Sequence, residues 1–301
     1  MITDLNNLKI RIQELLGKEI ASISLLASGA CNDAYLVETF LGHKYIVKRA
    51  KDAPEFRAQN SLVVEATVAR KLASLNLSIP MPRVVFASND PDMYGYEYID
   101  GELMITVWPS LSEEQRVSIC RKLGEFHAEL GAKVTKEMAC EMGVRVDDST
   151  GLHPETVEEY ASILASDDIP EWIKELAKRA NAIFDGTSDS AVFHFVHNDA
   201  HHENILIRDA QIVGIIDFGE TEYGEVAKEF SRYIRDFPKH FQYIVGSYEK
   251  ASGNHLSRQR LITNSLLSGL IDNVEDYRAG GKKRERCEAR WRRIKNSLDS
   301  F

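Results

Sequence analysis

The stretch from Phe195 to Ile207 reads FVHNDAHHENILI, and residues 214–219 a few positions later read GIIDFG. Apolar runs flank each polar cluster, which indicates strands that deliver short polar loops. Asn204 stands where a predicted hairpin over residues 205–216 begins, and Asp217 stands where it ends. Because strand pairing brings both ends of a hairpin together, we expect these two oxygen-bearing side chains to lie close to each other.

The residue types in this stretch suit phosphoryl transfer. Asn204 and Asp217 can together hold Mg²⁺, which takes hard oxygen ligands and shares its other positions with phosphates and water. Asp199, earlier in the loop, could accept a proton from an attacking hydroxyl or orient it. The pattern H-x-D-x-x-x-x-N followed by D-F-G is typical of protein-kinase-like catalytic sites. Ordinary turn and capping roles are the alternative, and they explain each residue alone better than the combination.

A lysine inside an apolar strand gives an independent indication of the same chemistry. Residues 45–48 read YIVK, so Lys48 belongs to a predicted strand. Lysines on strands usually lie on the solvated face. Glu65, early on a helix predicted over residues 61–75, is a natural partner that would turn Lys48 inward. A phosphate site needs such a cation, held in place.

The loop between the first two predicted strands is a candidate cover for the phosphates. Residues 28–33 read SGACND, so Ser28 and Gly29 lie where such a loop belongs. A single glycine is present, and turns of this composition are common without any ligand. Ser28 is therefore a candidate nucleotide contact by position rather than by a specific motif.

Strand and helix signals change along the chain. An N-terminal helix closed by Gly17 precedes the strands. Strands are predicted at residues 21–26, 34–39, 44–49, 83–87, 95–99, 193–196, 205–207 and 212–216. Helices are predicted at residues 61–75, 112–130, much of 156–184, and from 226 to the end.

This order predicts an α+β, bilobal protein-kinase-like fold. Residues 1–98 form the small β-rich N-lobe, with a nucleotide-binding antiparallel sheet and a helix. Residues 99–301 form the larger, mainly helical C-lobe, with the catalytic hairpin and a helical acceptor-binding subdomain. A cleft between two lobes is a common ligand site.

Composition limits the partners. The 301 residues carry a net charge of -9, which argues against nucleic acid and favours a cationic substrate. The first ten residues lack the pattern of a signal peptide, and no apolar run is long enough to span a bilayer, so we expect a cytoplasmic protein with no membrane partner. We also expect a monomer. The four cysteines form no C-x-x-C pair and are predicted to be free thiols.

Taken together, these motifs resemble the aminoglycoside phosphotransferase family, relatives of choline kinase within the protein-kinase-like fold. The resemblance covers nearly the whole chain and is greatest to the branch that modifies the 2″ hydroxyl of gentamicin-type drugs. It rests on Ser28-Gly29, Val47-Lys48, Glu65, residues 96–102 (YEYIDGE), residues 123–127 (LGEFH) and the two catalytic motifs.

The resemblance implies a role for each matching residue. Asp199 would be the catalytic base or would orient the hydroxyl, and Asn204 with Asp217 would bind Mg²⁺. Lys48, oriented by Glu65, would contact the α and β phosphates of ATP or GTP. Backbone groups from Glu97 to Ile99 would meet the purine edge.

One segment departs from that branch. It commonly has G-D-P-x-x-D after D-F-G, whereas residues 224–229 here read GEVAKE. In the branch this segment helps to brace the catalytic loop and borders the acceptor pocket. Glu229, in the place of the second aspartate, is therefore a candidate substrate contact, and the departure puts the substrate in doubt more than the chemistry.

The acceptor is predicted to be a small cationic molecule with a hydroxyl, first of all an aminoglycoside antibiotic. No A-P-E segment follows D-F-G, and Asn198 replaces the arginine of regulated protein kinases, so a protein substrate is not expected. Glu220 adds charge beside the expected acceptor site. Residues 147–175 carry nine carboxylates and one lysine, which would attract a polyamine-like ligand unless they are only solvated helix faces. A macrolide, choline or a sugar is the alternative acceptor.

Two functions from other classes of protein are alternatives to a kinase. His197, Asp199, His201 and His202 lie within six positions and suggest a metal-dependent hydrolase, although no second His cluster supplies the remaining ligands. A catalytically silent nucleotide-binding scaffold is the other. His201 and His202 are interpreted as polar loop residues, and His197 as a structural histidine bonded to backbone. The basic run at residues 282–293 is interpreted as a solvated helix face.

Overall fold

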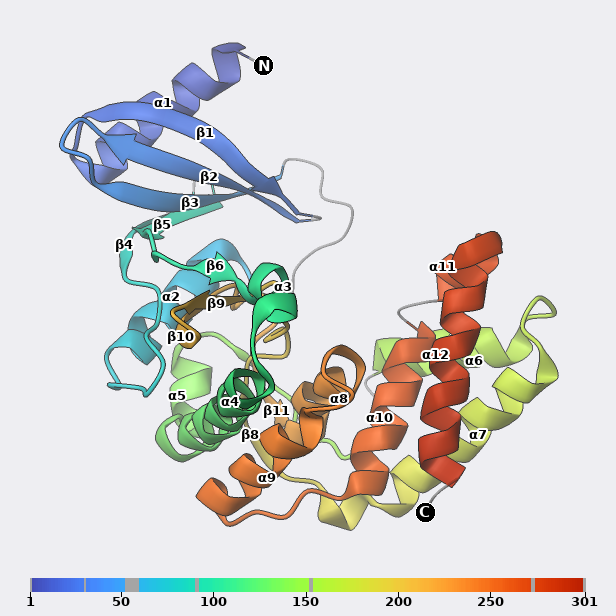
Figure 1. Cartoon of the computed structure of the whole chain (residues 1–301). Helices are drawn as coiled ribbons and strands as arrows, with labels where there is room; N and C mark the ends of the chain where they lie inside the picture. Colours follow the sequence, from blue (N-terminus) through green and yellow to red (C-terminus); the bar gives the residue numbers. More distant parts are fainter. Residues whose placement is uncertain are drawn as a thin grey trace. The chain divides into compact units, whose positions relative to one another are not determined.

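The structure, a computed structural model, describes residues 2–29, 31–51, 60–89, 92–151, 154–271 and 274–299 (Figure 1). The chain folds into two units. Unit 1 contains Met1–Ile119, Lys133–Arg145 and His197–Glu222, and unit 2 contains Cys120–Ala132, Val146–Val196 and Tyr223–Phe301. The predicted lobe boundary between residues 98 and 99 stays a prediction.

An antiparallel sheet in the order β1-β2-β3-β5-β4 forms the centre of unit 1. Its strands are β1 (Ile20–Ser28), β2 (Asn32–Thr39), β3 (Lys44–Ala50), β4 (Val84–Asn89) and β5 (Asp92–Glu97). The four strands predicted at residues 21–26, 34–39, 44–49 and 83–87 are confirmed.

The bounds predicted for the fifth strand, residues 95–99, are wrong, because β5 begins at Asp92 and ends at Glu97. Both faces of this strand are covered. Met93 packs in the cluster on one face, while Tyr94 and Tyr96 pack in the cluster on the other. A strand buried on both faces lacks the alternation of polar and apolar residues that marks its ends in a sequence.

Two helices cover these faces. Helix α1 (Ile2–Leu16) places Leu8 and Ile12 in the cluster that holds Met93, and Gly17 ends the helix with a left-handed φ of 62°. Helix α2 (Leu62–Ala73) packs Leu62 and Ala66 against the tyrosines of β5. The hydroxyl of Ser61 accepts from the N–H of Val64 and caps α2, so the first turn of α2 is fixed next to the sheet. Both predicted helices are confirmed.

The predicted hairpin is also present in unit 1. Strands β9 (Ile205–Arg208) and β10 (Gln211–Ile215) pair antiparallel, and β6 (Glu102–Leu103) adds to β9. The N–H of Ile216 donates to the carbonyl of Asn204 at 3.0 Å, which closes the open end of the hairpin. The residues before β9 and after β10 are therefore neighbours, as the sequence predicted.

Helices dominate the rest of the chain, as predicted. They are α3 (Met104–Val107), α4 (Glu113–Lys133), α5 (Lys136–Glu141), α6 (Pro154–Ala165), α7 (Glu171–Gly186), α8 (Val226–Asp236), α9 (Phe241–Ser252), α10 (Arg258–Ile271), α11 (Val274–Arg278) and α12 (Gly281–Asp299), with short 3-10 helices η1 (Trp108–Ser110) and η2 (Ser188–Ser190). Strands β7 (Arg145–Val146), β11 (Glu222–Glu225) and β8 (Phe193–Val196) form a further sheet. No helix among these described residues has the length and apolarity that a membrane span needs.

Gly124 sets the distance between α4 and α9 in unit 2. A methyl group at this position would lie 2.1 Å from the carbonyl oxygen of Ile244, so a side chain here would force the helices apart. Three residues along α4, the Nε2 of His127 bonds the hydroxyl of Tyr233 at 2.6 Å. Burial lowers the pKa of His127 to about 3, which keeps its imidazole neutral. The LGEFH segment is therefore a packing element of unit 2.

A buried arginine holds several segments of unit 2 together. Arg260 is 1% exposed, and its guanidinium donates through Nε and Nη2 to the carboxylate of Glu225, which is fully buried. Its other N–H groups donate to the carbonyls of Phe184 at 2.7 Å and Thr150 at 2.6 Å. Glu225 lies in the segment that departs from the G-D-P-x-x-D pattern, and this ion pair gives the substituted glutamate a structural role.

We expect Arg260→Leu to lower the free energy of unfolding by about 3–5 kcal/mol, because it leaves the Glu225 carboxylate buried without its cation. Urea unfolding followed by circular dichroism measures the loss. Arg278→Leu, which breaks the surface pair between Arg278 and Asp168, serves as the control and is expected to leave the urea midpoint almost unchanged. Equal midpoints for the two variants would contradict this role of Arg260.

Candidate active site

Lys48 lies on β3 with its side chain turned into unit 1, and the residue is only 6% exposed. Its Nζ donates to both carboxylate oxygens of Glu65, at 2.8 and 2.9 Å, and to Oδ1 of Asp217 at 2.9 Å. Three N–H bonds thus meet three carboxylate oxygens. The side chain of Lys48 points inward, as predicted. Its bond to Asp217, a second partner, connects the sheet to the hairpin.

Glu65 is completely buried on α2 and accepts four hydrogen bonds. Besides the two from Lys48, its Oε1 accepts from the hydroxyl of Tyr94 at 2.8 Å and from the backbone N–H of Phe218 at 3.0 Å. A carboxylate out of water needs such donors to stay ionised. Glu65 therefore fixes the ammonium of Lys48 and, through Phe218, the D-F-G turn.

The three charges alter one another's protonation. Burial alone would lower the pKa of Lys48, but the carboxylates of Glu65 and Asp217 outweigh it and raise this pKa above its ordinary value. Burial would raise the pKa of Asp217, and the nearby Lys48 ammonium reverses the shift and lowers it. Lys48 is consequently a permanent cation and Asp217 a permanent anion at neutral pH. The Asp217 side chain is 43% exposed, so its carboxylate still reaches solvent.

Asp199 and Asn204 are joined within one loop of unit 1. The Nδ2 of Asn204 donates to Oδ2 of Asp199 at 2.8 Å and to the Asp199 carbonyl at 2.9 Å. The Asp199 side chain is 22% exposed. Because the amide nitrogen of Asn204 is used on Asp199, its amide oxygen is left to face another group. The loop thus holds one accessible carboxylate and one amide oxygen in fixed positions.

His197 connects this loop to the D-F-G turn. Its Nδ1 accepts from the N–H of Asp199 at 3.2 Å, and its Nε2 bonds the carbonyl of Ile216 at 3.1 Å. These two bonds require a neutral ring with its proton on Nε2. The predicted structural role of His197 is confirmed.

Two residues of the catalytic motifs have left-handed backbones. Asn198 has a φ of 62° and Asp217 a φ of 68°, a region that costs most side chains about 1–2 kcal/mol. Asn and Asp tolerate it better than other non-glycine residues. This explains the Asn198 that stands where regulated protein kinases have arginine. Backbone strain of this kind is concentrated at functional sites.

Asn60 was not identified from the sequence. It lies just before α2 and is 6% exposed. Its N–H donates to the carbonyl of Gly219 at 2.9 Å, and its Nδ2 donates to the carbonyl of Thr221 at 2.8 Å. Asn60 therefore holds the segment after D-F-G from a position more than 150 residues earlier, with no local signal in the sequence.

The predicted nucleotide contacts lie at two places in unit 1. The Ser28 hydroxyl donates to Oδ1 of Asp33 at 2.6 Å across the turn between β1 and β2. At the end of β5, the N–H of Glu97 donates to the carbonyl of Arg83 and that of Tyr98 to the carbonyl of Lys44, whereas the N–H of Ile99 donates to no acceptor among the described residues. The nucleotide contacts at Ser28, Glu97 and Ile99 all stay predictions.

The predicted substrate contacts differ in accessibility. Glu220 is half-buried in the loop after D-F-G in unit 1. Glu229 lies in the first turn of α8 in unit 2 and is 1% exposed, so its carboxylate is a poor first contact for a ligand from solvent. Several acidic residues of 147–175 are also engaged: Asp147 with Lys228, Asp168 with Arg278, and Glu171 and Glu175 with Lys178.

These pairs weaken the expectation of an acidic surface reserved for a ligand. Residues 147–175 contain a single lysine, but the cations that pair with their carboxylates lie outside this range. Asp148, Glu158 and Asp167 are the other described members, and Glu155 and Glu159 have side chains outside the described part. The window therefore carries less uncompensated negative charge than its composition indicates.

A metal-dependent hydrolase would need a group of side chains that holds a metal ion. In the described ranges, no group of three or more His, Cys, Asp or Glu side chains is placed to do so. His201 Nδ1 accepts from the N–H of Glu203 at 3.1 Å, and the ring lies 3.5 Å from Asp199. His201 is thus a loop residue, as interpreted, and the four described cysteines are free thiols.

Three solved structures resemble the fold of this chain. Aminoglycoside 2'-phosphotransferase-IIIa with GDP is 15% identical, with a TM-score of 0.69 over 97% of this chain and 99% of that one. Macrolide 2'-phosphotransferase MphH from Brachybacterium faecium is 16% identical, with a TM-score of 0.67 over 93% and 96%. APH(2")-IIa with streptomycin and ATP is 18% identical, with a TM-score of 0.64 over 95% of each chain. These likenesses confirm the α+β, kinase-like fold.

Sequence comparison adds the family. No curated protein sequence matches the chain. The phosphotransferase enzyme family matches residues 22–259, which include both catalytic motifs, Lys48 and Glu65. With the buried lysine, its paired glutamate and the D-F-G aspartate assembled in one unit, the chain belongs to the phosphotransferase enzyme family.

Proposed function

We propose that this protein transfers the γ-phosphoryl group of ATP or GTP to a hydroxyl of a small molecule. The observation that carries the proposal is the buried Lys48 ammonium, held by Glu65 and by the Asp217 carboxylate of the D-F-G turn. A strand lysine on the solvated face would need no such partners, whereas a triphosphate needs a cation that is held in place. Both donors are retained because the similar structures contain ATP in one case and GDP in the other.

The residues of unit 1 divide the work of phosphoryl transfer. Lys48 would contact the α and β phosphates, oriented by Glu65. For this, the third N–H bond of Lys48 has to exchange from Asp217 to a phosphate oxygen, while the two bonds to Glu65 keep the ammonium in place. The N–H of Ile99, the carbonyl of Glu97 and the Ser28 turn are the proposed contacts to the base and the phosphates.

Asn204 and Asp217 have the chemistry of a Mg²⁺ site. The amide nitrogen of Asn204 is bound to Asp199, so the amide oxygen is left for a ligand, and one oxygen of Asp217 is not used by Lys48. The bond between Ile216 and Asn204 brings the two residues to one end of the hairpin. Oxygen ligands of this kind suit Mg²⁺, which when bound neutralises charge on the β and γ phosphates.

Asp199 is the proposed base or orienting group for the acceptor hydroxyl. Its Oδ2 accepts from Asn204, which orients the carboxylate that would accept the hydroxyl proton. The N–H of Asp199 is held by His197, so the carboxylate is fixed relative to the D-F-G turn. Enzymes catalyse phosphoryl transfer mainly by such positioning and by electrostatic stabilisation, with little covalent chemistry of their own.

For the acceptor we propose an aminoglycoside first, with Glu220 in unit 1 as the candidate contact. The net charge of -9 supports a cationic acceptor through long-range attraction. A macrolide is the second candidate, because one of the similar structures is a macrolide 2'-phosphotransferase. Choline or a sugar would use the same chemistry. A monomer in the cytoplasm is the proposed state and place of the protein.

The sharpest test of this function is Asp199→Asn. We expect it to reduce phosphoryl transfer at least about a hundredfold, because general-base catalysis is lost, while nucleotide affinity stays within about threefold. Glu203→Gln, which neutralises an exposed carboxylate four residues away, is the matched control and should keep full turnover. Turnover is followed with labelled ATP, and affinity by calorimetry. Unreduced transfer in Asp199→Asn would reject the role of Asp199, and nucleotide binding without transfer to any acceptor in the wild type would favour a silent scaffold.

The acceptor is tested by a turnover screen with ATP and GTP against an aminoglycoside, a macrolide, choline and a hexose. We expect the aminoglycoside to be phosphorylated, with a KM that rises with added salt because screening weakens attraction to carboxylates. The KM for the macrolide at the same salt concentrations is the internal comparison. Turnover confined to a neutral sugar, or a KM independent of salt, would contradict the cationic acceptor and leave the kinase chemistry standing.

A further inference from the structure

Tyr94 of β5 lies directly opposite Lys48 of β3 in the antiparallel pair that these two strands of unit 1 form. Side chains at directly opposed positions of such a pair project from the same face of the sheet. Tyr94 is 1% exposed, and its hydroxyl donates to Oε1 of Glu65 at 2.8 Å. Two neighbouring side chains of the sheet therefore share a single carboxylate of α2.

Packing and protonation both fix the hydroxyl of Tyr94. Its ring lies in the cluster that holds Leu62 and Ala66 of α2, and it stacks on the ring of Tyr96 with centroids 5.7 Å apart. Burial and the neighbouring Glu65 charge raise the pKa of Tyr94 well above its ordinary value, so the hydroxyl keeps its proton at neutral pH. Tyr94 is thus a permanent and well-placed donor to Glu65.

The donors around Glu65 are divided unequally between its two oxygens. Oε1 accepts from Nζ of Lys48, from the hydroxyl of Tyr94 and from the N–H of Phe218. Among the described residues, Lys48 is the one donor to Oε2. The last torsion of a glutamate side chain has a broad energy minimum and is not fixed by the side chain itself. Tyr94 and Phe218 together therefore determine which carboxylate oxygen faces the D-F-G turn.

The orientation of Glu65 matters most once a nucleotide is bound. In the proposed reaction, the bond from Lys48 to Asp217 is replaced by one to a phosphate oxygen, and the ammonium then depends on Glu65 for its place. Tyr94 bonds Glu65 from β5 and takes no part in this exchange. A cation that stabilises phosphate charge has to be placed before the reaction, because small displacements of such groups cost large factors in rate.

We propose that Tyr94 is a positioning residue for phosphoryl transfer: its hydroxyl fixes the Glu65 carboxylate and, through it, the Lys48 ammonium that contacts the nucleotide phosphates. This inference rests on the proposed function and deepens it. Because the hydroxyl is bound to Glu65, Tyr94 acts through that carboxylate and not on the substrate. A tyrosine that only satisfied its own buried hydroxyl would affect stability and leave the nucleotide site unchanged.

The test compares Tyr94→Phe with the wild type in the full-length protein. This substitution removes one oxygen atom and keeps the packed ring, and circular dichroism shows that the variant is folded. We expect the Kd for ATP with Mg²⁺, measured by calorimetry, to rise at least about fivefold. The reason is that Glu65 loses a hydrogen bond to its charge and the Lys48 ammonium is then less well placed.

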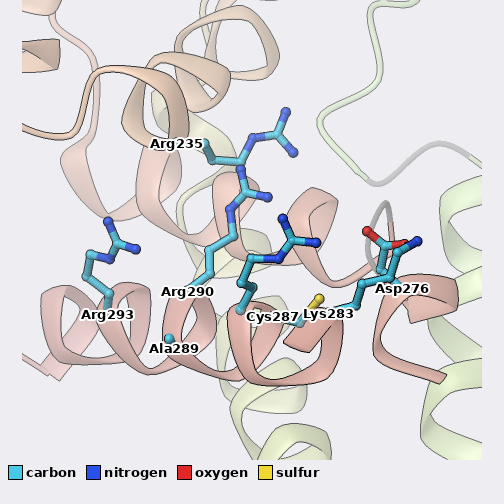
Figure 2. A pocket seen from close by; sticks show the side chains of 8 residues that line it. Arg235, Asp276, Lys283, Cys287, Ala289, Arg290 and Arg293 are labelled. Atoms are coloured by element: carbon cyan, nitrogen blue, oxygen red, sulfur yellow. The ribbon is translucent and has the colours of Figure 1, made fainter. Parts of the chain in front are cut away.

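Two control variants lie in unit 2. Tyr248→Phe removes the hydroxyl of another fully buried tyrosine, which accepts from Nδ2 of Asn254 at 3.4 Å. Lys283→Gln removes a cation from the lining of a cavity of about 420 Å³ in the C-terminal helices (Figure 2). It tests whether the measured ATP associates with that cavity instead of with Lys48. Both controls are expected to bind ATP with the Kd of the wild type.

A second measurement needs no nucleotide. The ammonium of Lys48 is buried with all three N–H bonds engaged, so its protons exchange slowly with water and its Nζ signal can be followed by NMR. The signal is assigned by its absence in Lys48→Arg. We expect it to shift or broaden in Tyr94→Phe and to stay unchanged in Tyr248→Phe, because only the first variant loosens Glu65.

The outcomes separate this inference from the function on which it rests. Wild-type ATP affinity in Tyr94→Phe, or a Lys48 signal identical to that of the wild type, would overturn the role of Tyr94 and leave the kinase chemistry standing. An equal loss of affinity in either control would overturn it too, because the effect would then be unrelated to Glu65. A wild type that binds no ATP would instead reject the proposed function and, with it, this role.

Discussion

An ammonium ion buried in a protein must be met by negative charge, and this requirement organises unit 1. Lys48 reaches into the interior from the middle of a sheet, and its three N–H bonds take up both oxygens of Glu65 and one of Asp217. Removing one member of such a buried group commonly costs about 3–5 kcal/mol, because the remaining charge is left without its partner. The strand, the helix and the turn after the hairpin are therefore fixed by one interaction.

Secondary bonds extend the same constraint to the catalytic loop. Glu65 also accepts the N–H of Phe218, Asn60 holds the turn that follows, and His197 joins the turn to Asp199. The Lys48 ammonium, which is the proposed phosphate contact, and Asp199, the proposed base, are thus connected through backbone atoms as well as through side chains. A site held in this way keeps its geometry before substrate arrives, which is the condition for electrostatic catalysis.

Much of this could be predicted from sequence because it depends on local pattern. The strands around Lys48 and the hairpin between Asn204 and Asp217 show in the alternation of polar and apolar residues, and the motifs place their functional side chains at the ends of those strands. Asn60 could not be predicted, because its partners are more than 150 residues away. Arg260 likewise gives no local sign that it pairs with Glu225. The charge counted over residues 147–175 was also misleading. Asp147 pairs with Lys228 and Asp168 with Arg278, and both cations lie outside that range.

Lys48 and Glu65 form a coupled pair around one buried ammonium, and a double-mutant cycle tests this coupling directly. Unfolding free energy and ATP affinity are measured for Lys48→Met, Glu65→Leu and the double variant. We expect each single variant to be destabilised by about 3–5 kcal/mol, the double variant to regain much of this loss, and ATP binding to be lost wherever Lys48 is replaced. Additive stability losses together with unchanged ATP affinity in Lys48→Met would contradict it.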